Sequence, residues 1–142
     1  EVMKVISKFI LIIIILIIIS CTNSDIVKYN KTLSCMCSGL DVKVRINGIK
    51  YFNYLDIDHS SLLGVIEITN NSKEIQSIDA NKISIVIGDR KSLLRIDKLV
   101  TTLFPVKDYY PKEFLAVEVY FEYDSNLKNE ILSNAEMLLI CE

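Results

Sequence analysis

From Leu40 onward, apolar and polar residues alternate in short runs, which is the pattern of half-buried β-strands. The first run covers residues 40–46 and places charged residues between the apolar ones. Asn47-Gly48 follows, a dipeptide that is typical of a two-residue type I′ turn. We therefore predict a β-hairpin here, whose return strand covers residues 49–55.

Four further segments have the alternation or apolar character of strands. They cover residues 62–69, 82–87, 115–123 and 136–141. Turn residues bound them, as in the cluster Asn70-Asn71-Ser72-Lys73 and in Gly88-Asp89. Six strands at this spacing predict an all-β domain built as an antiparallel sandwich or barrel.

Two segments allow more than one interpretation. Residues 92–103 carry apolar side chains at helical spacing, yet Leu93-Leu94-Arg95-Ile96 within them is equally compatible with an edge strand. Residues 127–135 predict a short helix or turn before the final strand.

The longest apolar run of the chain covers residues 9–19. Lys4 and Lys8 precede it, and Ser20 and Cys21 follow it. A basic segment, an apolar run and a small residue before a cleavage point are the features of a secretory signal. A spanning helix needs about 20 apolar residues, so the run is short for an uncleaved membrane anchor, which is the alternative.

The four residues Ile18-Ile19-Ser20-Cys21 resemble the lipobox of bacterial lipoproteins. In that family the cysteine thiol is diacylglycerylated, the peptide is cut before the cysteine, and the new amino group is usually acylated. The resemblance implies a signal peptide over residues 1–20 and a covalent lipid on Cys21, with no other cofactor. Two or more acyl chains hold a protein stably on a membrane, whereas one binds marginally.

This resemblance also implies a location. We expect a protein anchored by lipid in the cell membrane or the outer membrane, facing the periplasm or the cell exterior. Thr22 follows the cysteine, where an Asp would favour inner-membrane retention in Gram-negative lipoproteins. Residues 21–39 begin with a polar stretch without sustained period, so we predict a lipidated cysteine and tether there, and one domain over residues 40–142.

Two stretches carry a second resemblance: residues 65–72, a strand that ends in a polar turn, and residues 110–115, a Pro-led turn into a long strand. They resemble the small immunoglobulin-like domains of many uncharacterised bacterial lipoproteins. The resemblance implies an immunoglobulin-like antiparallel β-sandwich, and it implies no activity, because a fold does not dictate function. The chain departs from the pattern in having no tryptophan.

Three cysteines remain beside the lipid site: Cys35, Cys37 and Cys141. The first and last strands of immunoglobulin-like folds commonly neighbour each other, so the resemblance implies a disulfide from Cys141 to Cys35 or Cys37, with one thiol spare. Closing a loop of about 100 residues stabilises by up to ~4.7 kcal/mol in the chain-entropy model. The alternatives are free or intermolecular cysteines, or a metal or redox carrier in which Cys35-Met36-Cys37 binds Cu(I) as a soft ligand set.

Charge and motifs argue against several functions. Without the predicted signal the chain holds 14 Lys and Arg against 17 Asp and Glu, a net charge of −3, and its basic residues are dispersed. We therefore expect no nucleic-acid partner. The single histidine, His59, is expected in a solvent-exposed turn. Because nucleophile elbow, phosphate loop, CxxC and zinc-spaced histidines are all missing from the sequence, we expect neither an enzyme nor a metal site.

Aromatic residues form two groups along the chain. One contains Tyr51 and Tyr54, and the other contains Phe104, Tyr109 and Tyr110. Tyr is enriched at protein interfaces, so we predict that both groups contribute to a docking patch for an unknown envelope protein or a glycan. The alternative is that half of these rings fill the ends of the sandwich.

The sequence therefore predicts a membrane-anchored envelope protein with a binding or structural role and no catalysis. The alternative from another class is an inhibitor or immunity lipoprotein that neutralises a lytic enzyme. A protruding loop with a charged or Ser/Tyr tip would favour that alternative.

Overall fold

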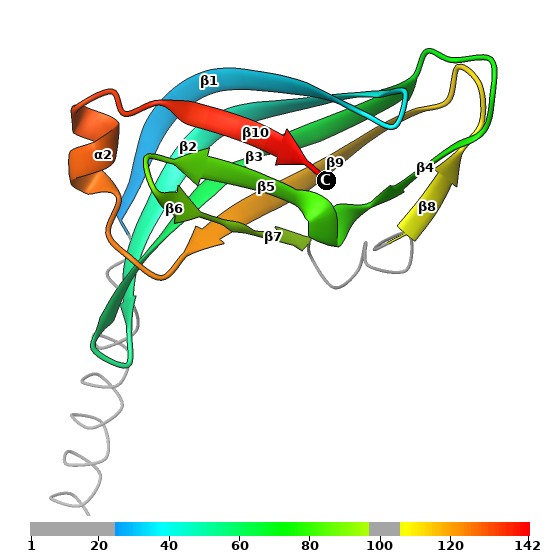
Figure 1. The fold of residues 1–142 in the computed structure, drawn as a ribbon. Coiled ribbons are helices and arrows are strands. Elements are labelled where there is room, and N and C mark those ends of the chain that lie inside the picture. Colours follow the sequence, from blue (N-terminus) through cyan, green and yellow to red (C-terminus); the bar gives the residue numbers. More distant parts are fainter. Residues whose placement is uncertain (1–24, 97–105) are drawn as a thin grey trace, which may run out of the picture.

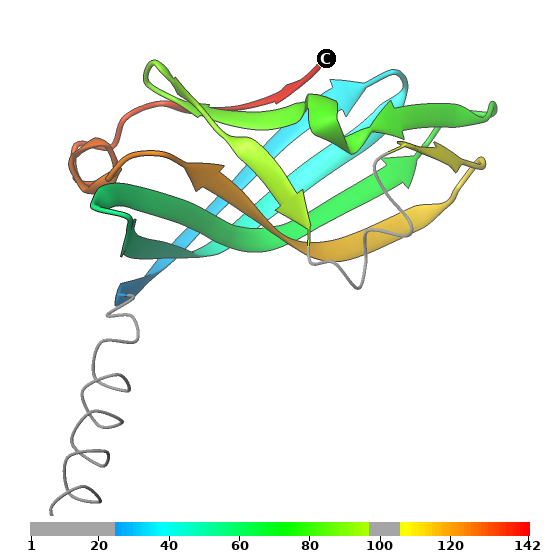
Figure 2. The same cartoon turned by 90° about the horizontal axis from the view of Figure 1, so that it is seen from below.

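Antiparallel β-sheets in two layers make up most of the chain (Figures 1 and 2). The computed structural model describes residues 25–96 and 106–142. The predicted all-β class is confirmed. The predicted signal peptide, Cys21 and Phe104 lie outside the described residues.

The larger layer is a five-stranded sheet in the order β1-β2-β3-β9-β7. Its strands are β1 (Asp25–Cys37), β2 (Leu40–Tyr54), β3 (Ile57–Asn70), β9 (Phe114–Tyr123) and β7 (Leu93–Ile96). β2 and β3 are its longest strands, and β3 occupies the centre.

The second layer combines a three-stranded sheet, in the order β10-β5-β6, with the two-stranded pair β4-β8. Its strands are β10 (Met137–Cys141), β5 (Ile83–Ile87), β6 (Arg90–Lys91), β4 (Gln76–Asp79) and β8 (Val106–Tyr109). A 3-10 turn, η1 (Ala80–Lys82), precedes β5, and the short helix α2 (Lys128–Leu132) precedes β10.

In the described part of the chain, no helix has the length and apolar character needed to cross a membrane.

The strands predicted at residues 62–69, 82–87, 115–123 and 136–141 are confirmed as β3, β5, β9 and β10. The helix predicted within residues 127–135 is confirmed as α2. Of the two interpretations of residues 92–103, the edge strand is confirmed for the first part, because β7 pairs with β9. Residues 97–103 lie outside the described ranges.

The predicted tether is wrong for residues 25–37, which form β1 and pair with β2 along its length. Leu33 and Cys37 point into the core, while most of the residues between them and before them are exposed. A strand at the edge of a sheet pairs on one side only, and here one face is solvated. Its composition therefore stays polar enough to resemble a tether.

The predicted hairpin at Asn47-Gly48 is also wrong. β2 continues through this dipeptide as one strand, with a bulge between Ile46 and Gly48. The chain turns later, at Leu55 and Asp56, whose φ angles of 50° and 62° suit a two-residue type I′ turn. Pairing with β3 on one side and β1 on the other therefore overrides the local turn preference of Asn-Gly.

The bulge at Asn47 decides which side chains face the core. Before it, the even-numbered residues of β2 are buried, ending at Ile46; after it, Ile49 is fully buried and Tyr51 packs against the core. One extra residue shifts the alternation by one position, so apolar side chains reach the core on both sides of the bulge.

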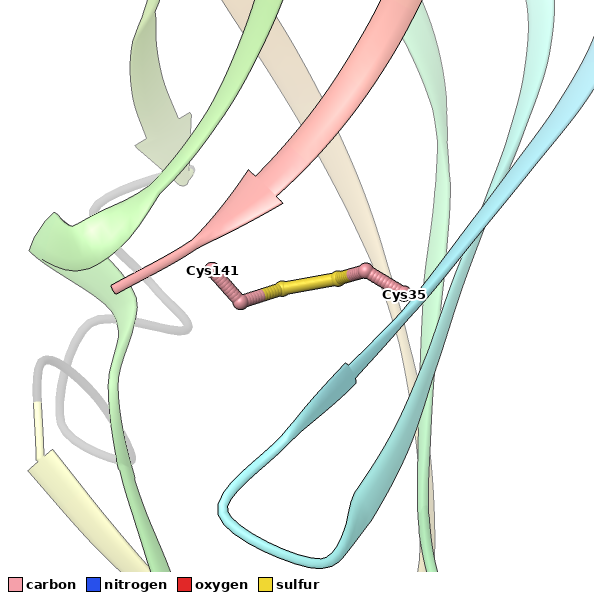
Figure 3. The surroundings of a disulfide bond; sticks show 2 residues. All are labelled: Cys35 and Cys141. Atoms are coloured by element: carbon pink, nitrogen blue, oxygen red, sulfur yellow. A yellow bond between two sulfur atoms is a disulfide. The ribbon is translucent and has the colours of Figure 1, made fainter.

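A buried hydrogen bond and a disulfide join the two layers. The Tyr123 hydroxyl of β9 donates to the Ile85 carbonyl of β5 at 2.8 Å, and burial raises the pKa of Tyr123 far above its usual value. Cys35 of β1 is bonded to Cys141 of β10, with Cα atoms 6.8 Å apart (Figure 3). This confirms the predicted disulfide and selects Cys35 over Cys37, which is a free, buried thiol.

Asn70 organises the end of β3 that lies farthest from the β2–β3 turn. It is fully buried, and its side-chain amide donates to the carbonyls of Glu74 and Tyr109, both at 2.8 Å. Its side-chain oxygen accepts from the Ser72 backbone amide at 2.9 Å and from the Ser72 hydroxyl at 2.7 Å. The predicted polar turn after β3 is therefore built around the buried side-chain amide of Asn70, whose NH2 group and oxygen atom both have hydrogen-bond partners.

The uninterrupted course of β2 can be tested at two glycines. A methyl group at Gly64 would overlap the Arg45 carbonyl oxygen and lie 3.1 Å from the Ile46 Cα, whereas at Gly48 the nearest atom, the Val27 carbonyl oxygen, is 3.5 Å away. We expect Gly64→Ala to lower the free energy of unfolding by about 1–3 kcal/mol. Gly48→Ala should be neutral, or stabilising by up to ~1 kcal/mol. Urea unfolding measures both, and a large loss at Gly48 would instead support a turn with positive φ there.

The cysteine assignment predicts a labelling pattern for acylated protein. Cys37 is 5% exposed, and burial raises the pKa of its thiol. We therefore expect slow alkylation of the native protein, one labelled thiol after unfolding without reduction, and three after unfolding with reduction. Intact mass counts the labels, and Cys37→Ala should remove the single label of the unreduced protein. Three labels without reduction would contradict the disulfide.

Candidate functional site

The outer face of the five-stranded sheet, turned away from the second layer, carries a groove of about 330 Å³. Strand alternation after the bulge places Lys50 and Phe52 of β2 on this face, beside side chains of β3 and β9. The lining residues are Lys50, Phe52, Ser61, Leu63, Tyr120 and Glu122. The groove therefore combines two aromatic rings and an aliphatic side chain with charges of both signs.

A row of three rings extends the groove toward the β2–β3 turn. Phe52 lies opposite His59 in the strand register, and their rings are stacked with centroids 5.2 Å apart and planes 11° apart. Tyr54 meets His59 edge-on at 6.4 Å. We call Phe52, His59 and Tyr54 the aromatic row. At its groove end, the Lys50 ammonium lies 5.6 Å from the centre of the Phe52 ring.

His59 occupies a partly enclosed position, so the prediction of a solvent-exposed turn histidine is wrong. It lies within β3, and its side chain is 13% exposed. Its Nδ1 atom is buried without a hydrogen bond, 3.5 Å from an Asp124 carboxylate oxygen. This contact becomes an ion pair when the imidazole is protonated. The physical reason for the burial is the Phe52 ring, which covers one face of the imidazole.

A smaller hollow of about 170 Å³ adjoins the aromatic row at Phe52 and His59. It is mostly polar and is lined by Asp25, Tyr51, Phe52, Asn53, Asp58, His59 and Asn126. The Asn53 amide donates to Asp58 at 3.1 Å. Aromatic faces flanked by amides, carboxylates and a lysine can bind a partner by stacking and hydrogen bonding. Within residues 25–96 and 106–142, no group of three or more His, Cys, Asp or Glu side chains could hold a metal ion.

The docking role predicted for Tyr109 is wrong, because this residue belongs to the core. Tyr109 is fully buried on β8, and the Lys107 ammonium lies 4.1 Å from the centre of its ring. Burial raises the pKa of Tyr109 far above its usual value, with a smaller contribution from the Glu113 carboxylate. Tyr110, the next residue, is 62% exposed.

The two aromatic groups do not form one patch. Tyr54, the last residue of β2, is paired with Ile57 at the start of β3. Tyr110 follows Tyr109, whose carbonyl accepts a hydrogen bond from the Asn70 side chain at the end of β3. Residues 57–70 in extended form span about 43 Å, so the groups lie at opposite ends of the sheet (Figure 1). Tyr51 faces inward and packs against the core, and Phe104 lies outside the described residues. Tyr54, which was grouped with Tyr51 in the sequence, is exposed.

Cys35, Met36 and Cys37 do not form a ligand set. Cys35 is in the disulfide and Cys37 is buried. Met36 is 67% exposed, on the opposite face of β1. The metal or redox carrier therefore has no site in this arrangement.

Sequence reasoning missed the groove and the place of His59 in the aromatic row beside it. The signal is present as the alternation of Lys50, Phe52 and Tyr54, matched by Ser61 and Leu63 on the next strand. It becomes visible only when residues 40–54 are read as one strand with a bulge, because the bulge sets which of these side chains point outward.

Comparisons with known proteins bear on the fold alone. No family model and no curated protein matches the chain. It is similar to a solved structure described as a functionally unknown protein from Listeria monocytogenes EGD-e, with a TM-score of 0.54. The match covers 81% of this chain and 76% of that chain at 14% sequence identity. A likeness at this identity shows a shared fold.

Stacking of Phe52 on His59 predicts an energetic coupling between them. In a double-mutant cycle of Phe52→Ala and His59→Ala, we expect a coupling of about 0.5–1.5 kcal/mol in the free energy of unfolding. As a control, Phe52→Ala combined with Leu132→Ala, an exposed residue on α2, should be additive. Additivity at Phe52 and His59 as well would show that the two rings do not stack in solution.

Proposed function

We propose that this protein is a lipid-anchored protein of the cell envelope, held in the membrane through Cys21, with a binding or structural role and no catalysis. The observation that carries the proposal is where the domain begins. β1 starts at Asp25, four residues after a cysteine that follows an apolar run with lysines ahead of it. An anchor at Cys21 would therefore hold the domain close to the membrane surface.

The disulfide supports an exported location. Disulfides form and persist in oxidising compartments, whereas cytosolic thiols are usually kept reduced. The Cys35–Cys141 bond joins segments separated by 106 positions in the sequence. In the chain-entropy model such a long closure restricts the unfolded chain strongly. A domain anchored outside the cytoplasm would gain this stabilisation.

We further infer that the two layers form an immunoglobulin-like sandwich. The support is the pairing of a five-stranded and a three-stranded antiparallel sheet, with the first and last strands bridged at one edge. The β4-β8 pair would then be an addition to one end. Such sandwiches commonly serve as scaffolds for binding surfaces.

The outer groove and the aromatic row are the surface on which a partner would dock. Phe52 and Tyr120 line the groove with aromatic rings, and Lys50 and Glu122 line it with charged side chains. This combination suits a glycan ring or the polar rim of an envelope protein. It replaces the patch predicted around Tyr109 and Tyr110, and the anchor would keep this surface at the envelope.

The anchor is tested on protein extracted from membranes of a bacterial host that processes lipoproteins. We expect an intact mass that corresponds to a chain starting at Cys21 with acyl groups attached. Cys21→Ala should lose the acyl mass and the firm membrane attachment, because the lipid is transferred to the thiol of Cys21 and alanine has no thiol. Cys37→Ala is the matched control and should keep both. An unacylated chain that retains residues before Cys21 would contradict the proposal.

A further inference from the structure

The β2–β3 hairpin ends in a group of exposed apolar side chains. Tyr54, Leu55 and Ile57 are 63%, 77% and 54% exposed, and we call them the apolar tip. Ile26 and Val27, near the start of β1, are also exposed. Large apolar side chains gathered at a protruding turn are a feature of surfaces that meet a membrane or a partner.

The turn itself is poorly suited to the residues that form it. Leu55 and Asp56 both have positive φ angles, a region that favours Gly and Asn and disfavours a bulky side chain such as Leu. The Asn-Gly pair that would fit such a turn stands instead at residues 47–48, inside β2. Leu55 therefore gains neither burial nor a relaxed backbone within the domain. Leu55 is a bulky apolar residue that is both exposed and held at positive φ, and neither property stabilises the domain. Such a position points to a role in contact with something outside the domain.

The apolar tip lies beside the point where the chain enters the domain. Asp25, the first residue of β1, is paired with Tyr51, so the hairpin continues past Asp25 by the four residues to Leu55. This extension is about 13 Å long. Both views show the turn of the hairpin and the start of β1 at the same end of the domain, with the β4-β8 pair at the other end (Figures 1 and 2).

The same length separates Asp25 from Cys21. Four residues of chain reach at most about 14 Å, and Cys21 precedes Asp25 by four positions. A chain of this length keeps Cys21 within reach of the end of the domain that carries the apolar tip. A lipid on Cys21 would bring the bilayer surface to this tip.

We propose that the apolar tip inserts into the headgroup region of the membrane in which Cys21 is anchored. This inference rests on the proposed lipid anchor. A lipid on a short tether fixes one point, and the tip supplies a second, so the domain takes a defined orientation on the membrane. Tyr54 suits the interface, because its ring is apolar and its hydroxyl reaches water. Asp56 and Asp58 limit the depth, since carboxylates remain at the level of the headgroups.

The chain has no tryptophan, so a single introduced tryptophan reports its own surroundings. Tyr54→Trp places it on the apolar tip, and Tyr110→Trp, at a residue of nearly equal exposure (62%), is the matched control at the other end of the domain. Each full chain is purified with its acyl groups and reconstituted in vesicles of phosphatidylethanolamine and phosphatidylglycerol, with and without bromine on the lipid acyl chains. We expect a blue shift and bromine quenching for Tyr54→Trp, and neither for Tyr110→Trp.

A third chain separates insertion from mere proximity. It combines Tyr54→Trp with Leu55→Asn, Asp56→Gly and Ile57→Thr, which gives the turn residues that its positive φ angles favour and keeps a β-branched residue in β3. The hairpin should therefore stay folded while the apolar surface is lost. We expect the blue shift and the quenching to fall, with the melting temperature kept or raised. Unchanged quenching would overturn insertion by the tip.

The outcomes separate this inference from the proposed anchor. Acylated Tyr54→Trp protein without bromine quenching overturns the membrane contact and leaves the lipid anchor in place. Quenching in a chain whose mass shows no acyl group supports the contact and overturns the lipid anchor. A blue shift that depends on protein concentration, without quenching, assigns the tip to a second copy of the chain and overturns the membrane contact.

Discussion

The long pairing of β2 with β3 determines which side chains of β2 reach the core and which face outward. It runs from Leu40 opposite Asn70 to Tyr54 opposite Ile57, with one extra residue, Asn47, in the bulge. If Asn47 paired as a regular strand residue instead of forming the bulge, Ile49 and Tyr51 would point to solvent instead of the core. The same pairing stacks Phe52 on His59, lines the outer groove and carries the apolar tip beyond the start of β1. The positions of the core, the outer groove and the apolar tip are therefore set by one register.

Hydrophobic alternation predicts most of the strands, because each has one face on the core and one in solvent. β9 is the clearest case, and its register with β3 is regular over its whole length. The failures have physical causes. Asn47-Gly48 satisfies a local turn preference, but strands on both sides hold it in the sheet. β1 is polar because it is an edge strand. Tyr109 stands in a strand of four residues, too short for alternation to show that its ring is buried.

The candidate site was less predictable than the fold. Its residues are ordinary strand residues, and what brings them together is the outward phase that the bulge imposes on Lys50, Phe52 and Tyr54. Cysteine pairing was predictable to within one choice, because the first and last strands of immunoglobulin-like folds commonly neighbour each other. Cys35 and Cys37 share the inner face of β1, and packing places Cys35 beside β10 and encloses Cys37. In the proposed account the domain has two ends with different tasks. The end with the apolar tip meets the membrane, and the Asn70 end closes the core away from it.

β2 runs unbroken past Asn47 to a tip beside the start of β1. Solution NMR of the isotopically labelled protein in detergent micelles tests it through cross-strand contacts between backbone protons. The observed register predicts nuclear Overhauser effects between Asp25 and Tyr51, between Phe52 and His59, and between Tyr54 and Ile57. Contacts that instead pair Ile46 with Ile49 across a turn at Asn47-Gly48, with none linking Phe52 to His59, would contradict it and remove the groove and the tip together.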